Sequence, residues 1–123
     1  MATEIKKRTH KDSFKDAFSG LRWVLKTQPN FRFHLVLSAV ALTLGYMLQV
    51  TSVEMAIIVF TIILGLTAEM INTSIESMTD LITKEYREDA KIAKDVAAGM
   101  MLVTAIGAIL VAVFVFVPHI LNY

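Results

Sequence analysis

The segment from Val96 to Val117 contains 22 consecutive residues without one Asp, Glu, Lys or Arg. A helix needs about 20 apolar residues to cross the roughly 30 Å hydrocarbon core of a bilayer. Two further apolar runs cover residues 33–50 and 53–71. The mean hydropathy is +0.59, and 55% of the 123 residues are apolar, which is too much for an ordinary soluble domain of this size. We therefore predict an all-α membrane protein, one domain over 1–123, with transmembrane helices at 33–50, 53–71 and 96–117.

Residues 12–27 have the pattern of an amphipathic helix. Apolar side chains recur there at helical spacing, and most of the charged ones lie on the other sides. A helix of this kind can lie in the headgroup layer of a membrane, and Trp23 is suited to anchor it there. The alternative is a helix packed against its own protein. The sequence Gln28-Pro29-Asn30 should end the helix, since proline cannot continue the hydrogen-bond ladder. The apolar positions are Phe14, Phe18, Leu21 and Leu25.

The connections between the apolar runs carry helix-start and helix-stop signals. Thr51 or Ser52 can cap the second run, with Glu54 in its first turn. Asp89 can cap the third helix, and Pro118 is expected to end it. The first run carries a stripe of small residues, and the third run is rich in Ala and Gly. Because small residues let helices approach closely, we expect a helix bundle.

The positions of the basic residues predict the topology. Eight of the twelve Lys and Arg precede residue 33, and the other four lie between Lys84 and Lys94. The loop at 49–54 and the tail after Pro118 contain none. The positive-inside rule therefore places the N-terminus and the loop at 80–95 in the cytoplasm of a multi-pass protein.

Composition excludes several classes of site. The chain has no cysteine, so disulfides, thiolate metal sites and a cysteine nucleophile are excluded. Neither a Walker loop nor a G-x-G-x-x-G motif is present. The formal net charge of +1 argues neither for nor against nucleic acid. A nucleotide site in this chain would have to be built from helix side chains.

Polar groups interrupt the end of the second apolar run. Glu69, Asn72, Glu76 and Asp80 are spaced i, i+3, i+7 and i+11, which keeps them on one narrow helix face. Glu69 is the deepest, at the inner end or edge of the bilayer. An ionisable group there costs roughly 2.5 to 3.5 kcal/mol on insertion scales and is by default a candidate functional residue.

This polar face is expected to meet Lys94 and Asp95 at the start of the third helix. Carboxylate and amide oxygens suit Mg²⁺, which binds proteins through one or two carboxylates together with nucleotide phosphates. Lys94 and Arg87 could hold phosphate charge, and a deep carboxylate could accept a proton from a lipid hydroxyl. These are the groups that phosphoryl transfer requires.

Other interpretations of the same residues remain open. Glu69 and Asn72 could hydrogen-bond neighbouring helices as packing contacts, and Lys94-Asp95 could be a cap and a headgroup contact. A scaffold, or a small transporter with a carboxylate ion relay, is the alternative class of function. Taken alone, His34 is an interfacial residue, and His10 and His119 are too isolated for a metal site.

Two motifs resemble a known family. The stretch Ala68 to Glu76, AEMINTSIE, is similar to the E-x-x-N-[ST]-[AS]-I-E signature of the bacterial integral-membrane diacylglycerol kinases. The stretch Ala93 to Gly99, AKDVAAG, resembles the second motif of that family, A-K-D-x-[AG]-[AS]-[AG]. Gly20-Leu21-Arg22 and Asn30-Phe31-Arg32 also match the family pattern, and the three-span layout covers essentially the whole chain.

The resemblance implies a homotrimer in the bacterial plasma membrane, with active sites between protomers. It also implies an ATP-dependent lipid kinase that uses Mg²⁺ at the cytoplasmic face. The expected partners are the lipid substrate, ATP, the membrane and other copies of the chain, and not nucleic acid.

The resemblance also assigns roles to residues. Glu69 would be the general base, and the lipid substrate would contact Glu69, Ala98 and His34. Glu76 would bind Mg²⁺ and ATP. Gln28 stands where the family usually has a metal-binding glutamate, and its amide oxygen can ligate a metal but brings no negative charge. Thr9 stands where the family has a basic residue, with Arg8 beside it. The remaining ATP-binding positions would be Asn72, Glu85, Tyr86, Arg87, Lys94 and Asp95.

The first apolar run gives an indication of the substrate. Asn30-Phe31-Arg32-Phe33-His34-Leu35 resembles the N-F-R-[IF]-H-L of the undecaprenol kinase branch. The branch that phosphorylates diacylglycerol tends to have polar and acidic residues after Phe-Arg. We therefore expect undecaprenol as the substrate, with diacylglycerol as the alternative.

Overall fold

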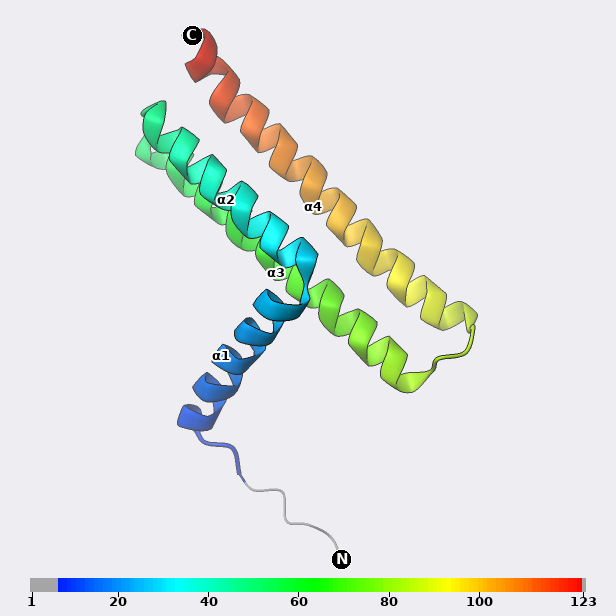
Figure 1. Cartoon of the computed structure of the whole chain (residues 1–123). Helices are drawn as coiled ribbons and strands as arrows, with labels where there is room; N and C mark the ends of the chain where they lie inside the picture. Colours follow the sequence, from blue (N-terminus) through cyan, green and yellow to red (C-terminus); the bar gives the residue numbers. More distant parts are fainter. Residues whose placement is uncertain (1–6, 123) are drawn as a thin grey trace, which may run out of the picture.

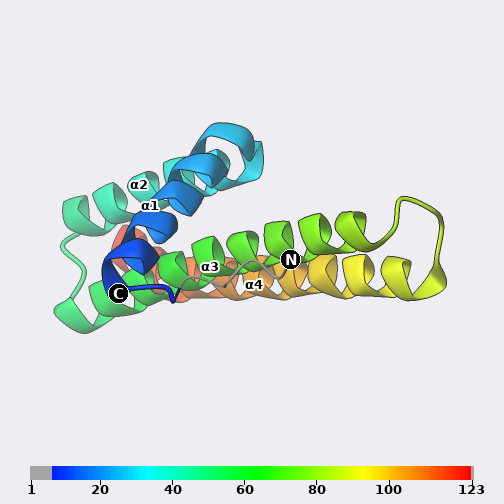
Figure 2. The same cartoon turned by 90° about the horizontal axis from the view of Figure 1, so that it is seen from below.

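The computed structural model describes residues 7–122, which form four α-helices. They are α1 (His10–Thr27), α2 (Pro29–Met47), α3 (Ser52–Ile82) and α4 (Glu88–Leu121). α3 and α4 lie side by side and antiparallel along most of their length (Figures 1 and 2). α2 packs against the first part of α3, so the last turns of α3 continue beyond it (Figure 1). α1 leaves the start of α2 at an angle to the other helices.

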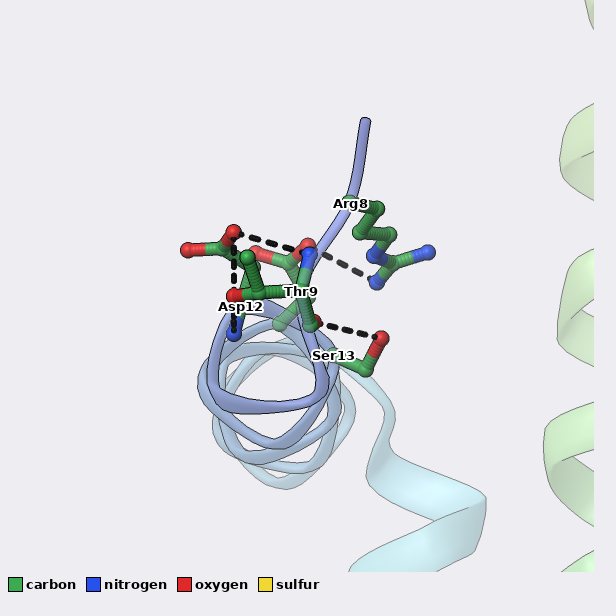
Figure 3. A network of polar contacts seen from close by, with 5 residues as sticks. Arg8, Thr9, Asp12 and Ser13 are labelled. Atoms are coloured by element: carbon green, nitrogen blue, oxygen red, sulfur yellow. Dashed lines mark hydrogen bonds and ion pairs between the residues drawn. The ribbon is translucent and has the colours of Figure 1, made fainter. Parts of the chain in front are cut away.

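A reciprocal cap fixes the start of α1 (Figure 3). The Asp12 backbone N–H donates to Thr9 Oγ1 at 3.2 Å, and Asp12 Oδ2 accepts the Thr9 backbone N–H at 3.1 Å. Hydrogen bonds from the Thr9 side chain and backbone lower the pKa of the Asp12 carboxyl. The helix therefore begins at His10, two residues before the predicted start, because this cap holds its first turn.

The corner between α1 and α2 forms at the predicted break. Gln28 ends α1 and also precedes α2, whose first residue is Pro29. Proline is favoured at a first helical position, where its missing N–H would lack an intrahelical partner in any case. The Arg32 guanidinium donates to the carbonyl oxygens of Leu25 at 3.3 Å and Lys26 at 3.0 Å. These bonds tie the last turn of α1 to the first turn of α2.

The turn between α2 and α3 is tight. α2 ends at Met47, three residues before the predicted end, and Gln49 has a positive φ of 53°. Thr51 caps α3 through a reciprocal pair of bonds with Glu54, as one of the two predicted capping residues. A Cβ at Gly45 would lie only 3.0 Å from Met55 Cε. The glycine in the small-residue stripe thus permits the close approach of α2 and α3.

Two predictions about the ends of α4 are wrong. The helix starts at Glu88 with Arg87 in the N-cap position, so Asp89 is not the cap. Asp89 lies in the first turn, where its negative charge interacts favourably with the helix dipole. Pro118 lies inside the helix, which continues to Leu121 and ends with Asn122 at a positive φ of 58°. Proline removes one backbone hydrogen bond, but it does not prevent the next three residues from keeping helical dihedral angles.

α3 and α4 are long and apolar enough to cross a membrane, judged by length and composition. At 1.5 Å per residue they are about 46 and 51 Å long, so their ends extend beyond a 30 Å hydrocarbon core. One copy of the chain buries few side chains, and large apolar residues remain exposed along α2, α3 and α4. Such a surface requires lipid or further protein around it. Within residues 7–122 the buried apolar residues are Val24, Phe31, Ile58, Ala68, Ala97 and Val115.

Candidate active site

The polar face of α3 runs from the interior of the bundle towards the loop that joins α3 to α4. Glu69 is buried, with only 3% of its surface exposed, while Asn72 is half-buried. Glu76 is exposed and Asp80 is half-buried. The helix thus presents one deep carboxylate and two shallower ones on the same side, which is an arrangement that can serve a lipid and a water-soluble molecule together.

Glu69 lies where α3 is covered by α2 and α4. Its Oε2 is 3.9 Å from Nε2 of His34 on α2. The hydroxyl of Thr73, one turn further on, donates to the Glu69 backbone carbonyl at 2.9 Å. This hydroxyl therefore does not donate to the Glu69 carboxylate. Burying a carboxylate costs free energy unless a cation or a hydrogen-bond donor lies near it. The His34 imidazole is a group that can fill this role.

Asn72 and Glu76 form the next level of the face. The Asn72 side-chain amide donates to Glu76 Oε1 at 3.5 Å, a long and weak contact. Asn72 Oδ1 is buried and has no hydrogen-bond partner within the described structure. A buried acceptor without a partner costs free energy, so this oxygen is suited to a ligand or to a further chain.

The outermost level joins the two long helices. Lys94 Nζ on α4 donates to Asp80 Oδ1 on α3 at 2.7 Å. This pair lies outside the apolar segments 53–71 and 96–117. The hydrogen bond lowers the pKa of the Asp80 carboxyl and raises the pKa of the Lys94 ammonium, so both groups stay charged at neutral pH. The spacing had placed Asp80 on the polar face, but sequence reasoning assigned it no role.

Other predicted site residues are not drawn into this cluster. Asp95 is exposed and forms an ion pair with Lys91 on its own helix, so the predicted meeting of Asp95 with the polar face is not seen. Ala98 is exposed, whereas its neighbour Ala97 is buried. The Gln28 side-chain amide donates to Thr27 Oγ1 at 3.3 Å, at the corner between α1 and α2. Three predicted nucleotide contacts lie in the exposed connection from α3 to α4: Glu85, Tyr86 and Arg87.

An apolar cavity of about 150 Å³ lies between α2, α3 and α4, and His34 is among its lining residues. Three hydroxyls also line it, but each donates to a carbonyl of its own helix: Ser38 to His34 O, Thr61 to Ile57 O and Thr104 to Met100 O. The hydroxyls are therefore satisfied. The pocket can therefore take an apolar group.

A second cross-helix pair lies at the opposite end of α3 and α4. His119 Nε2 is 2.9 Å from Glu54 Oε2. The sequence separates these two residues by 65 positions, and no spacing rule could have paired them. His119 is thus a contact between α4 and the first turn of α3.

Within residues 7–122 no group of three or more His, Asp or Glu side chains could hold a metal ion without other ligands. Glu76 and Asn72 are neighbours on α3, and Asn72 turns its NH2 group, not its Oδ1, towards the Glu76 carboxylate. With the amide turned over, the Glu76 carboxylate and the Asn72 oxygen would face the same point. This set fits Mg²⁺ that takes its other ligands from phosphates and water, which is how that ion usually binds.

The comparisons with known proteins identify the family of the chain. The family model described as prokaryotic diacylglycerol kinase matches residues 15–116. The chain belongs to this family. The family and the relatives that match this chain are named for lipid kinases.

Three relatives show the range of activities for which the matching proteins are named. A diacylglycerol kinase of Synechocystis sp. is 36% identical over 111 residues, which are 89% of this chain and 63% of that protein. The chain therefore spans less than two thirds of the length of that relative. An undecaprenol kinase of Bacillus subtilis is 36% identical over 107 residues, 86% of each chain. A diacylglycerol kinase of Escherichia coli is 27% identical over 94 residues, which are 76% of this chain and 77% of that protein. Identity alone does not choose between the two lipids.

Proposed function

We propose that the protein transfers the γ-phosphate of ATP to the hydroxyl of undecaprenol at the cytoplasmic face of the membrane. The observation that carries the proposal is the position of Glu69. It is a buried carboxylate beside His34, His34 also lines an apolar cavity, and Glu69 shares a helix face with polar groups that lead outward to Lys94. A lipid hydroxyl and a nucleotide phosphate can therefore be brought to adjacent levels of one helix.

The proposed membrane placement follows from the charges and the helix lengths. α2, α3 and α4 span the bilayer, and α1 lies in the headgroup layer with the N-terminus in the cytoplasm. Phe14 and Phe18 of α1 are exposed and carry no packing contact that would bury them, which supports an interfacial helix. The polar ends of α3 and α4, with their connecting loop, then lie at the cytoplasmic surface.

The chain's own side chains supply the steps of the transfer. The Glu69 carboxylate accepts the proton of the lipid hydroxyl as the oxygen forms its bond to the γ-phosphorus and the bond to ADP breaks. The Lys94 ammonium stabilises the negative charge on the phosphates. Burial keeps water from competing with the lipid hydroxyl at Glu69. The separation of Glu69 from Lys94 along the helices assigns lipid to the deep level and nucleotide to the outer one.

The proposed metal is Mg²⁺, held by Glu76 with the Asn72 amide oxygen and the nucleotide phosphates. Bound there, it would neutralise phosphate charge. Gln28 is proposed as a further neutral ligand. The buried Asn72 Oδ1, which lacks a partner in the described residues, supports a ligand at this level.

We further propose that the active form is a homotrimer with sites between protomers. The support is the large apolar surface that one copy leaves exposed along its three longest helices, together with the stripes of small residues. The oxygen of Asn72 that is unpaired in one copy is also suited to a contact supplied by a neighbouring copy.

The preference for undecaprenol over diacylglycerol rests on His34 and on the cavity that it lines. The cavity of about 150 Å³ has room for a short segment of a lipid chain beside His34, which belongs to the motif that resembles the undecaprenol kinase branch. The undecaprenol kinase of Bacillus subtilis matches this chain over 86% of its own length. Diacylglycerol remains the alternative substrate.

The direct test of kinase activity is lipid-dependent release of ADP by the purified protein in detergent micelles. We expect ADP only when Mg²⁺, ATP and a lipid with a free hydroxyl are all present. A lipid with the hydroxyl methylated is the matched control. A scaffold or an ion relay would release no ADP under any of these conditions, and that result would overturn the proposal.

Replacing Glu76 with Gln should raise the Mg²⁺ concentration needed for half-maximal activity by about tenfold, the size expected when a charged ligand becomes a neutral one. Activity at saturating Mg²⁺ should recover in large part. The measurement is a Mg²⁺ titration at fixed ATP, with Glu88→Gln as a control because Glu88 is exposed at the start of α4. An unchanged Mg²⁺ requirement would remove Glu76 from the metal site.

A further inference from the structure

Lys94 is held in place by Asp80, a residue that has no role in the proposed mechanism. Its ammonium on α4 donates to Asp80 on α3 at 2.7 Å, across 14 positions of sequence. Both side chains are close to half exposed, at 42% for Lys94 and 47% for Asp80. A lysine ammonium has three donors, so this contact leaves two of them available.

Glu76 lies one turn before Asp80 on the same face of α3. Its negative charge adds a smaller attraction for the Lys94 ammonium to that of Asp80, in the direction that raises the pKa of the lysine. The ammonium is thus attracted towards the level at which we place the metal and the phosphates. A lysine at a helix surface otherwise samples many rotamers, and ordering it on binding would cost conformational entropy.

We propose that Asp80 is a positioning residue that holds the Lys94 ammonium at the outer end of the polar face, one helical turn from Glu76, with two donors directed to the phosphates of ATP. The inference rests on the proposed function, because it assigns Asp80 to the nucleotide half of the same site. Asp80 itself does not touch the reacting atoms. Its effect is to organise Lys94 in advance, so that ATP binds without first ordering that side chain.

A purely structural role for the pair is the competing explanation. Exposed ion pairs contribute little to stability, and α3 and α4 are already packed along their length by contacts that include the buried Ala68 and Ala97. Loss of the Asp80 charge should therefore leave the bundle intact. The two explanations predict different changes in nucleotide affinity.

The experiment compares Asp80→Asn with the unmodified protein in micelles. Binding of a non-hydrolysable ATP analogue with Mg²⁺ is measured by calorimetry, and KM for ATP and kcat are measured in parallel. We expect the Kd for the analogue and the KM to rise about tenfold, as for the loss of one charge-assisted contact. Because bound ATP still meets Lys94, kcat should stay within about twofold of the original value.

Two further variants make the result specific. Asp80→Glu keeps the carboxylate and should recover most of the nucleotide affinity. Asp89→Asn makes the same chemical change at an exposed position in the first turn of α4 and should alter neither KM nor Kd. Thermal unfolding of all variants reports any loss of the bundle separately from nucleotide binding.

Each outcome decides something. Equal Kd and KM for Asp80→Asn and the unmodified protein would overturn the role of Asp80 and leave the kinase proposal standing. A lower melting temperature and lower kcat with unchanged Kd would also overturn it, because that is the signature of a structural clamp. If the unmodified protein binds no analogue at all, the proposed nucleotide site and the role of Asp80 fall together.

Discussion

Replacing Glu69 with Gln lowers kcat by about a thousandfold, within the range that a positioned general base contributes. The amide has nearly the same size and stays buried beside His34, but it cannot accept the proton of the lipid hydroxyl. KM for ATP should change little, because Glu76 lies two turns further along α3 and Lys94 lies on α4. Steady-state kinetics in micelles measure both parameters.

Glu54→Gln is the matched control for this variant. It makes the same substitution on the same helix, at the end of α3 where Glu54 contacts His119. We expect its kcat to stay within about twofold of the original, since no reacting group lies there. Full activity of Glu69→Gln would remove Glu69 as the base, and an equal loss in both variants would show that the effect is structural.

Replacing Lys94 with Met lowers kcat/KM for ATP by about 100- to 1,000-fold, the loss expected when a group that stabilises transition-state charge is removed. Met keeps much of the length of the side chain and loses the ammonium. The loss should appear in both kcat and KM, since Lys94 contacts the phosphates before and during transfer.

The control for Lys94→Met is Lys84→Met, which removes an exposed ammonium from the connection between α3 and α4. It should retain nearly all activity. If Lys94→Met kept its affinity for ATP and lost only stability, Lys94 would be a helix clamp and the nucleotide site would have to lie elsewhere.

The helices could be predicted from the sequence because each has a local sequence signal. Apolar runs of bilayer length marked three helices, Pro29 marked the corner after α1, and Thr51 with Glu54 marked the start of α3. The exact ends of the helices were harder to predict. Pro118 was read as a stop because proline disfavours helix, but a proline close to the end disrupts only one bond of the final turns.

The residue spacing predicted the polar face of α3, but it could not predict the contacts that this face makes. Residues at i, i+3, i+7 and i+11 share a face whatever surrounds the helix. Burial of Glu69 against His34, and the bond from Lys94 to Asp80, depend on how three helices pack. The pairing of Asp95 with Lys91 is a local contact at i, i+4 on one helix, and it competes with the ATP-binding role that the motif implied.

The most direct test of the proposed function is transfer of radiolabelled phosphate from MgATP by the purified protein, with undecaprenol and a diacylglycerol offered in the same micelles. The two labelled products are separated and counted. We predict that undecaprenol is labelled faster than the diacylglycerol. Faster labelling of diacylglycerol would keep the kinase and contradict the substrate proposed from His34 and the apolar cavity. Labelling of neither lipid by folded protein would contradict the assignment of Glu69 as a base for a lipid hydroxyl.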